Sequence, residues 1–147
     1  MGPGAARDAS CACGVASLTA FVDTDVLIRH LTGDPPGQAR RATAVLAEAE
    51  QLLVTDVVFA ECVFVLESFY EAPRPQVATT MRALLAMPTV TVADQPVLLR
   101  ALEVYEQDRL HFAEAQLVAV AEASGVGRVL SFDKGLKRAT SIEWWEP

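Results

Sequence analysis

The apolar residues of this chain form short runs that alternate with segments of helical spacing. Apolar runs that end at polar or turn residues predict five strands, at Leu18–Val22, Leu52–Val54, Thr89–Val92, Arg128–Ser131 and Ile142–Trp145. Apolar residues three and four positions apart predict six helices, at Val26–Leu31, Gly37–Glu50, Thr55–Tyr70, Gln76–Met87, Pro96–Gln107 and Phe112–Ala123. Strands separated by helices of this length favour an α/β fold with a mostly parallel sheet covered on both faces.

The pattern indicates one domain over residues 19–147, preceded by a leader over residues 1–18. The leader is rich in Gly, Ala, Ser and Cys without clear periodicity, so we expect it to be flexible. Cys11 and Cys13 have the spacing of half a metal site, but no second Cys or His pair follows nearby, which favours a tail without a metal. A chain of 147 residues, 52% of them hydrophobic, is long enough to bury a core.

Charge and cysteine content narrow the functional classes. The net charge of −7 disfavours non-specific adhesion to nucleic acid or anionic lipid, although bound metal ions can reverse the sign of one patch. The longest apolar runs, Val57–Ala60 and Cys62–Leu66, are split by Glu61 and are far too short to cross a membrane. Three cysteines do not make a disulfide framework and no segment resembles a signal peptide, so we expect a cytoplasmic protein.

Three aspartates follow directly on predicted strands. Asp23 and Asp25 come after the first strand, and Asp133 comes after the fourth. Sites in open parallel sheets form at the carboxyl ends of strands, so these positions are suited to chemistry. Plainer interpretations stand beside this one, because Thr24 or Asp25 can cap the next helix and the segment 133–135 reads equally well as a turn.

Glu61 interrupts an apolar helical segment. On a helix it shares its face with the residues three and four positions away, which are Val57, Val58, Phe64 and Val65. A carboxylate on an apolar face loses much of its hydration, so we expect a compensating cation or hydrogen-bond donors. The alternative is an internal salt bridge to an Arg on a neighbouring helix.

Glu114 repeats this pattern near the start of the helix predicted at Phe112–Ala123. An acid in the first turn of a helix also suits the helix dipole without any further function. Taken together, these carboxylates would repel one another if they converged without a cation. Oxygen-only ligands suit Mg²⁺ or Mn²⁺, and such a site facing a phosphodiester predicts hydrolytic chemistry.

Four segments that contain these acids stand in a characteristic order, at Phe21–Arg29, Val58–Val63, Phe112–Leu117 and Ser131–Lys134. In this order and at these separations they resemble the motifs of PIN-domain ribonucleases, and most of all the VapC-type toxins of bacterial toxin–antitoxin pairs. The resemblance covers about residues 19–145. It implies a PIN-like three-layer α/β/α sandwich around a central, mostly parallel sheet of about five strands.

The resemblance implies a Mg²⁺- or Mn²⁺-dependent endoribonuclease that pairs with itself and is inhibited by a cognate antitoxin. Asp23, Glu61 and Asp133 fall on family acidic positions. The third motif usually carries Asp where this chain has Glu114, and the first usually reads Asp-Thr-Asn where this chain has Asp25. We therefore expect Asp23, Glu61, Glu114 and Asp133 to be the metal-binding catalytic residues, with Asp25 as a further candidate ligand.

Two other functions compete with this interpretation. A haloacid-dehalogenase-like phosphatase also binds Mg²⁺ through an Asp-x-Asp pair like Asp23 and Asp25, but it needs a downstream Lys and a further acidic pair. The two lysines of this chain, Lys134 and Lys137, follow Asp133, the last of the candidate acids, which is the wrong order. A catalytically weak PIN-fold binding module is the second alternative, because of Glu114.

Few basic residues are placed to bind RNA. We expect Thr24, Arg29 and Lys134 to contact substrate, and Lys137 and Arg138 to be solvated surface charges. The choice among RNA sequences depends on loop shape and stacking partners, which one chain does not reveal.

The hydrophobic content also predicts a binding surface for a partner. The helices at Val57–Tyr70 and Gln76–Met87 carry large apolar residues, and some of these are expected to form an exposed groove: Phe64, Phe69, Tyr70, Leu84 and Leu85. The resemblance implies that a segment of the antitoxin fills such a groove.

Overall fold

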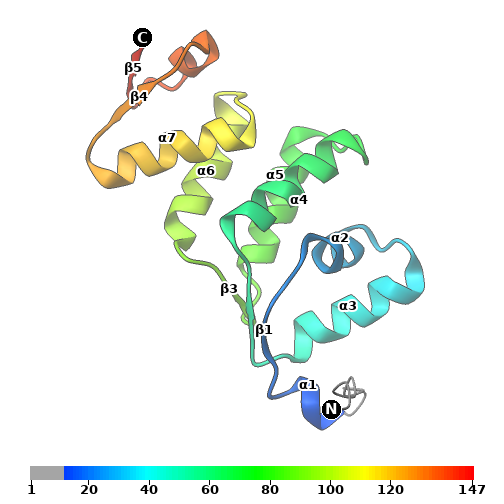
Figure 1. Cartoon of the computed structure of the whole chain (residues 1–147). Coiled ribbons are helices and arrows are strands. Elements are labelled where there is room, and N and C mark those ends of the chain that lie inside the picture. The colour runs from blue at the N-terminus through cyan, green and yellow to red at the C-terminus, as the bar shows by residue number, and fades with distance from the viewer. Residues whose placement is uncertain (1–11) are drawn as a thin grey trace, which may run out of the picture.

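The structure is a computed structural model that describes residues 12–147 (Figure 1). Its elements in chain order are α1 (Ala12–Val15), β1 (Thr19–Phe21), α2 (Thr24–Thr32), α3 (Pro36–Glu48), β2 (Gln51–Leu53), α4 (Asp56–Ser68), α5 (Arg74–Leu85), β3 (Val90–Thr91), α6 (Gln95–Gln107), α7 (Phe112–Ser124), β4 (Arg128–Leu130), the 3₁₀ helix η1 (Lys134–Arg138) and β5 (Glu143–Trp145). Residues 1–11 of the predicted leader, and with them Cys11, lie outside the described residues. Ala12–Val15, which also belong to the predicted leader, form the single turn of α1.

Every predicted strand and helix is present, and each of its ends lies within two residues of the predicted position. The small shifts follow from capping. The helix expected from Val26 begins at Thr24 because Asp23 accepts a hydrogen bond from the Thr24 N–H, and it ends at Gly33, whose φ of 74° suits glycine. The sequence does not predict the 3₁₀ helix η1, because the residues that favour a turn also favour a single 3₁₀ turn.

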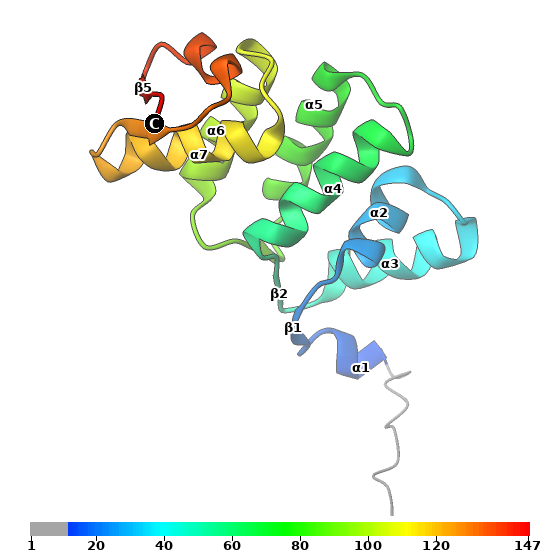
Figure 2. The same cartoon turned by 45° about the horizontal axis from the view of Figure 1, so that its top comes forward.

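The strands are all parallel, as predicted, but they form two ladders instead of one continuous sheet. The first ladder has the order β1-β2-β3, and the second pairs β4 with β5. Figures 1 and 2 both place β4 and β5 at the end of the molecule farthest from α1, with α6 and α7 lying between them and β1. The α/β class and the parallel direction are confirmed, and the expectation of one five-stranded sheet differs from the observed pairing.

A hydrogen-bonded ion pair between α6 and α7 also contacts the segment that precedes β5. Glu122 of α7 accepts bonds from the Arg100 guanidinium of α6 at 2.8 and 3.0 Å and from the hydroxyl of Ser141, which precedes β5. The same contacts lower the pKa of the Glu122 carboxyl, first through Arg100 and then through Ser141. Strand pairing is a long-range choice that local patterns do not encode, so the sequence predicted the strands but not which edges meet.

The core lies between the helices and positions α4 at the centre of the fold. The ring of Phe112 on α7 packs 5.5 Å from Phe59 on α4 and 6.1 Å from Tyr105 on α6, measured between ring centroids. The helix α4 contacts α2, α5 and α7, so it connects the helix that follows β1 with the helix that precedes β4. Within residues 12–147, no helix is long and apolar enough to cross a membrane.

The predicted partner groove is only partly correct. Leu84 and Leu85 are buried in the core, so they do not form an exposed surface. They occupy the inner face of α5, which turns toward α4 and α6. Phe64 and Phe69 are exposed, as expected for a surface that contacts a partner.

Candidate functional site

Asp23 and Glu61 are connected through Thr24. Asp23 is the N-cap of α2, and its Oδ1 accepts a hydrogen bond of 2.8 Å from the Thr24 N–H. The buried Thr24 hydroxyl in turn donates a bond of 2.6 Å to Oε2 of Glu61 on α4. Two carboxylates from elements far apart in the sequence are therefore held in one short network at the carboxyl end of β1.

Glu61 is exposed, so the expectation that it loses its hydration is wrong. The buried stripe of α4 consists of Phe59, Cys62, Val63 and Leu66, and Glu61 lies on the other side of the helix. A helix that is apolar almost all round gives no periodic signal for its buried face, which is why the sequence misplaced Glu61. The position of the Glu61 carboxylate is therefore fixed by the hydrogen bond from Thr24 and not by burial.

A pocket of about 320 Å³ opens beside this network between α2 and α4. Its lining includes Asp23, Asp25 and Glu61, together with Arg29 of α2. The pKa of the neighbouring Cys62 thiol indicates the sign of the local charge. Burial, and then the negative charges of Glu61 and Asp23, raise the pKa of Cys62 to about 12, so the thiol stays protonated. The pocket is therefore an electronegative position that suits a cation.

Glu114 and Asp133 form a second carboxylate pair. Glu114 lies in the first turn of α7, where its Oε2 accepts a bond of 3.2 Å from the His111 N–H in a capping box. Asp133 caps η1 and accepts a bond of 2.8 Å from the Gly135 N–H. Glu114 therefore serves a helix start and Asp133 a turn, as the plainer interpretations expected, and the two carboxyl groups also lie close enough to shift each other's pKa.

The interaction between Glu114 and Asp133 separates the acidities of the two groups. The pKa of Glu114 is raised, first by its interaction with Asp133 and then by partial burial. The pKa of Asp133 is lowered, first by its interaction with Glu114 and then by the Gly135 N–H. Two carboxyl groups this close hold a proton between them or need a cation in its place.

The structure thus places the predicted acids in two pairs and not in one cluster. Within residues 12–147, no three His, Cys, Asp or Glu side chains lie close enough together to hold one ion. The helices that carry the two pairs are joined directly, because the Gln116 amide of α7 donates a bond of 2.9 Å to Oδ2 of Asp56 at the start of α4. The pairs therefore lie on elements fixed to each other.

Asp56 is a residue whose importance the sequence argument missed. Its second carboxylate oxygen, Oδ1, is buried without a hydrogen-bond partner among the described residues. A signal was available, because Asp56 follows β2 in the way that Asp23 follows β1. Asp56 does not cap α4, because Thr55 performs that role and accepts a bond from the Val58 N–H.

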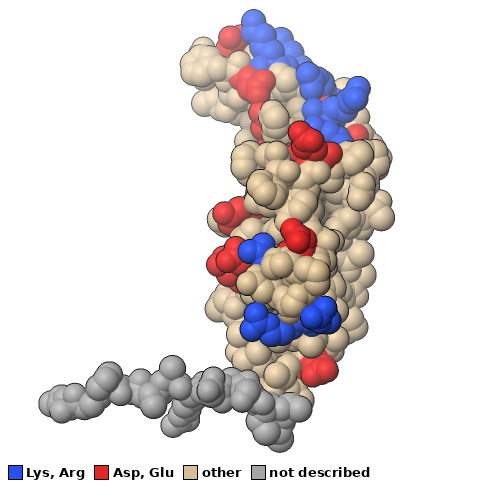
Figure 3. Space-filling model, turned by 90° about the vertical axis from the view of Figure 1, so that its right-hand side faces the viewer, with Lys and Arg blue, Asp and Glu red and all other residues tan. Residues whose placement is uncertain are grey.

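Basic side chains lie beside the second pair, on η1 and the loop before α7. Figure 3 shows Lys and Arg gathered at the top of this view, the end of the molecule that holds the second ladder. Arg138 donates a bond of 3.2 Å to the carbonyl of Arg109, and its charge contributes to the lowered pKa of Asp133. Lys134 is exposed next to Asp133, whereas Lys137 stacks 4.3 Å from the centre of the Trp144 ring. Arg138 is therefore nearer to the acids than expected.

Comparisons with known proteins give one family. No curated protein matches the chain at a significant level. The PIN domain family matches residues 20–141, a span that includes all four acids of the two pairs. PIN domains are generally nucleases, typically bind divalent metal ions and commonly act on RNA. Because the match covers most of its length, the chain belongs to the PIN domain family.

Proposed function

We propose that this protein is a Mg²⁺- or Mn²⁺-dependent endoribonuclease and the toxin of a toxin–antitoxin pair. The observation that carries the proposal is the hydrogen-bonded network in which Thr24 holds the carboxylates of Asp23 and Glu61. Glu114 and Asp133, which shift each other's pKa, form a second pair of carboxyl groups. Carboxyl groups gather in this way where a cation or a proton compensates their charge. In a PIN domain, the compensating group that fits is a divalent metal ion.

The donor set fits Mg²⁺ or Mn²⁺. Both ions prefer oxygen ligands, and Mg²⁺ is commonly held by one or two carboxylates together with waters and substrate phosphate. Asp23 and Glu61 would hold an ion at the pocket, with Asp25 available from the same lining, and Glu114 and Asp133 would hold one at η1. A bound divalent ion supplies charge neutralisation of the phosphodiester and activation of the attacking water.

The residues around the acids fix the geometry that this chemistry needs. The Thr24 hydroxyl holds Oε2 of Glu61, and the Thr24 N–H holds Oδ1 of Asp23, so one residue orients both carboxylates. The capping box holds Glu114 against the start of α7. Pre-oriented groups lower the cost of reaching the reactive arrangement.

Arg29 and Lys134 are the proposed contacts to RNA phosphates, and Arg138 joins them from its position near Asp133. We propose that one RNA backbone passes these cations at both acidic pairs. The strongly acidic chain binds nucleic acid weakly elsewhere on its surface.

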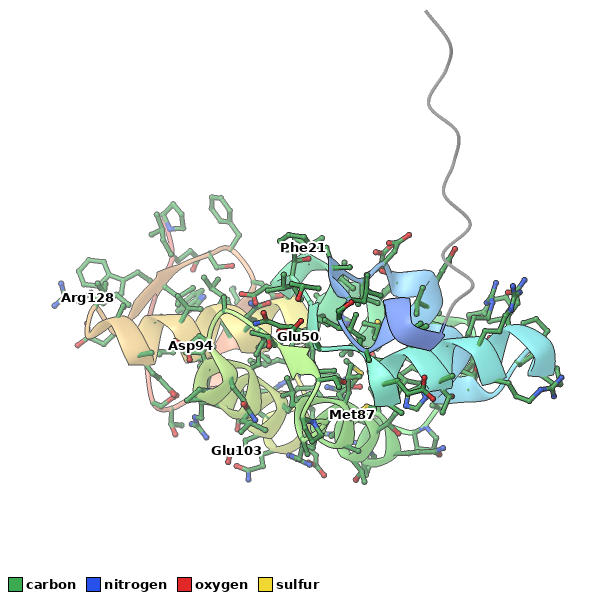
Figure 4. The ribbon with its side chains drawn as sticks, turned by 90° about the horizontal axis from the view of Figure 1, so that it is seen from below. Phe21, Glu50, Met87, Asp94, Glu103 and Arg128 are labelled. Carbon is green, nitrogen blue, oxygen red and sulfur yellow. The ribbon has the colours of Figure 1, made fainter. Side chains whose placement is uncertain are left out.

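The proposed partners are an antitoxin and a second copy of the chain. Exposed apolar side chains support this, because Phe21, Val57 and Phe64 are 73%, 76% and 67% exposed. Figure 4 shows Phe21 on the opposite side of the molecule from Met87 and Glu103. Light scattering on the purified protein is expected to give twice the mass of one chain, and a single-chain mass at every concentration would count against self-pairing.

Cleavage of single-stranded RNA by chelator-treated protein, with and without added Mg²⁺, tests the nuclease proposal. Metal-dependent cleavage is expected. A weak binding module would bind RNA without cutting it, and a haloacid-dehalogenase-like phosphatase would release phosphate from a small monoester and leave the RNA intact. The three functions therefore give three different outcomes, which are internal RNA fragments, bound but intact RNA, and phosphate released from a monoester.

A further inference from the structure

The pocket beside Asp23 and Glu61 has an aromatic wall that the carboxylate chemistry does not use. Phe69 and Tyr70 line it from the C-terminal end of α4. The two rings pack edge to face, with centroids 5.0 Å apart and planes at 71°. Phe69 is nevertheless 76% exposed, so a large part of its ring faces solvent at the pocket.

The aromatic wall is held in place. The backbone N–H groups of Phe69 and Tyr70 both donate to the carbonyl of Val65, at 3.0 and 3.3 Å. Tyr70 is half-buried and supports the Phe69 ring from one side. Because the Phe69 ring already packs against Tyr70, it offers a stacking surface that loses less conformational freedom on binding than an unsupported ring would.

The pocket also contains a cation that pairs with no acid. The Arg29 Nε donates a bond of 2.8 Å to Gln38, and none of the ion pairs found in residues 12–147 includes Arg29. The volume of about 320 Å³ lies at the small end of the roughly 300–1,000 Å³ typical of ligand pockets. An aromatic wall, a free guanidinium and metal-binding acids match the base and the phosphate of a nucleotide.

We propose that Phe69, supported by Tyr70, stacks on one base of a single-stranded RNA whose adjacent phosphate lies at Asp23, Glu61 and Arg29. This inference rests on the proposed nuclease function and adds the recognition of an unpaired base. Bases inside a duplex are already stacked on their neighbours and do not offer a free face to Phe69. The favoured substrate is therefore single-stranded.

The test compares RNA binding by Phe69→Leu and by the matched control Phe64→Leu. Phe64 is another exposed phenylalanine of α4, but it does not line the pocket. All proteins carry Asp23→Asn so that a labelled RNA of about eight nucleotides stays intact. Base–aromatic stacking of about 1–3 kcal/mol per base predicts that Phe69→Leu weakens binding about 5- to 150-fold, whereas Phe64→Leu binds as the parent does.

A set of RNAs with one abasic nucleotide at each position identifies the stacked base. For the parent protein, one abasic position is expected to weaken binding by about the same factor as Phe69→Leu. With Phe69→Leu, that position is expected to cause no further loss, because the stacking partner is already gone. An unchanged thermal midpoint shows that each exposed substitution leaves the fold intact.

Equal binding by Phe69→Leu and Phe64→Leu would overturn the inference, because the Phe69 ring would then add nothing to RNA binding. An abasic loss that persists in Phe69→Leu would overturn it as well. Cleavage by the protein with Asp23 restored is measured separately. If the abasic pattern is present without any cleavage, the nuclease proposal fails and base stacking stands, whereas cleavage without the pattern rejects only the stacking.

Discussion

Replacing Asp23 by Asn is expected to reduce metal-dependent RNA cleavage by at least about a hundredfold. The substitution keeps the size of the side chain but removes a negative charge that the electronegative pocket offers to a cation. Loss of one pre-oriented electrostatic group at a reacting centre typically costs about 10²–10³ in rate. Asn is as good an N-cap as Asp, so α2 and the thermal midpoint should be unchanged.

Asp94→Asn is the matched control for this prediction. Asp94 is also an exposed N-cap aspartate, and its Oδ1 accepts a bond of 3.1 Å from the Val97 N–H at the start of α6. Its substitution should leave cleavage at the wild-type rate. Full activity in Asp23→Asn, or an equal loss in Asp94→Asn, would show that the charge at Asp23 has no special role.

Glu114→Ala is expected to reduce cleavage by about ten- to a hundredfold, whereas Glu114→Asp should keep or increase it. Ala removes both the partner of Asp133 and the oxygen that caps the His111 N–H. Asp retains the charge and restores the shorter side chain usual in the third motif. Because Mg²⁺ tolerates little departure from octahedral geometry, wild-type activity should also be higher with Mn²⁺ than with Mg²⁺.

Glu114→Gln separates the two roles of this residue. Gln at the third helical position still completes a capping box, so the helix start is preserved while the charge is lost. We expect its cleavage rate to fall with that of Glu114→Ala and its thermal midpoint to stay with wild type. If Glu114→Gln cleaves RNA as fast as wild type, Glu114 is only a helix-start acid and the site depends on the other carboxylates.

The elements of the fold were predictable from local patterns, but the pairing of their edges was not. Short apolar runs and helical spacing identified all five strands and six longer helices, because each is specified by residues a few positions apart. The separation of β4 and β5 from β1–β3 is a matter of which strand edges meet, and these edges belong to segments far apart in the sequence.

The sequence predicted which residues belong to the candidate site better than it predicted how they are arranged. The rule that chemistry gathers at strand ends selected Asp23 and Asp133, and applied once more it would have selected Asp56. The exposure of Glu61 could not be read from α4, since that helix is apolar around most of its circumference. The division into two pairs depends on how α2, α4, α7 and η1 are arranged in space, which no local motif encodes.

The most direct measurement is cleavage of a 5′-labelled single-stranded RNA by wild-type protein that has been treated with a chelator and dialysed. Without added metal, the RNA is expected to remain intact. Addition of Mg²⁺, and more strongly of Mn²⁺, should produce internal fragments at a rate that falls to background in Asp23→Asn. Cleavage that is equal with and without metal, or that persists in Asp23→Asn, would contradict the assignment of these carboxylates to a metal-dependent nuclease site.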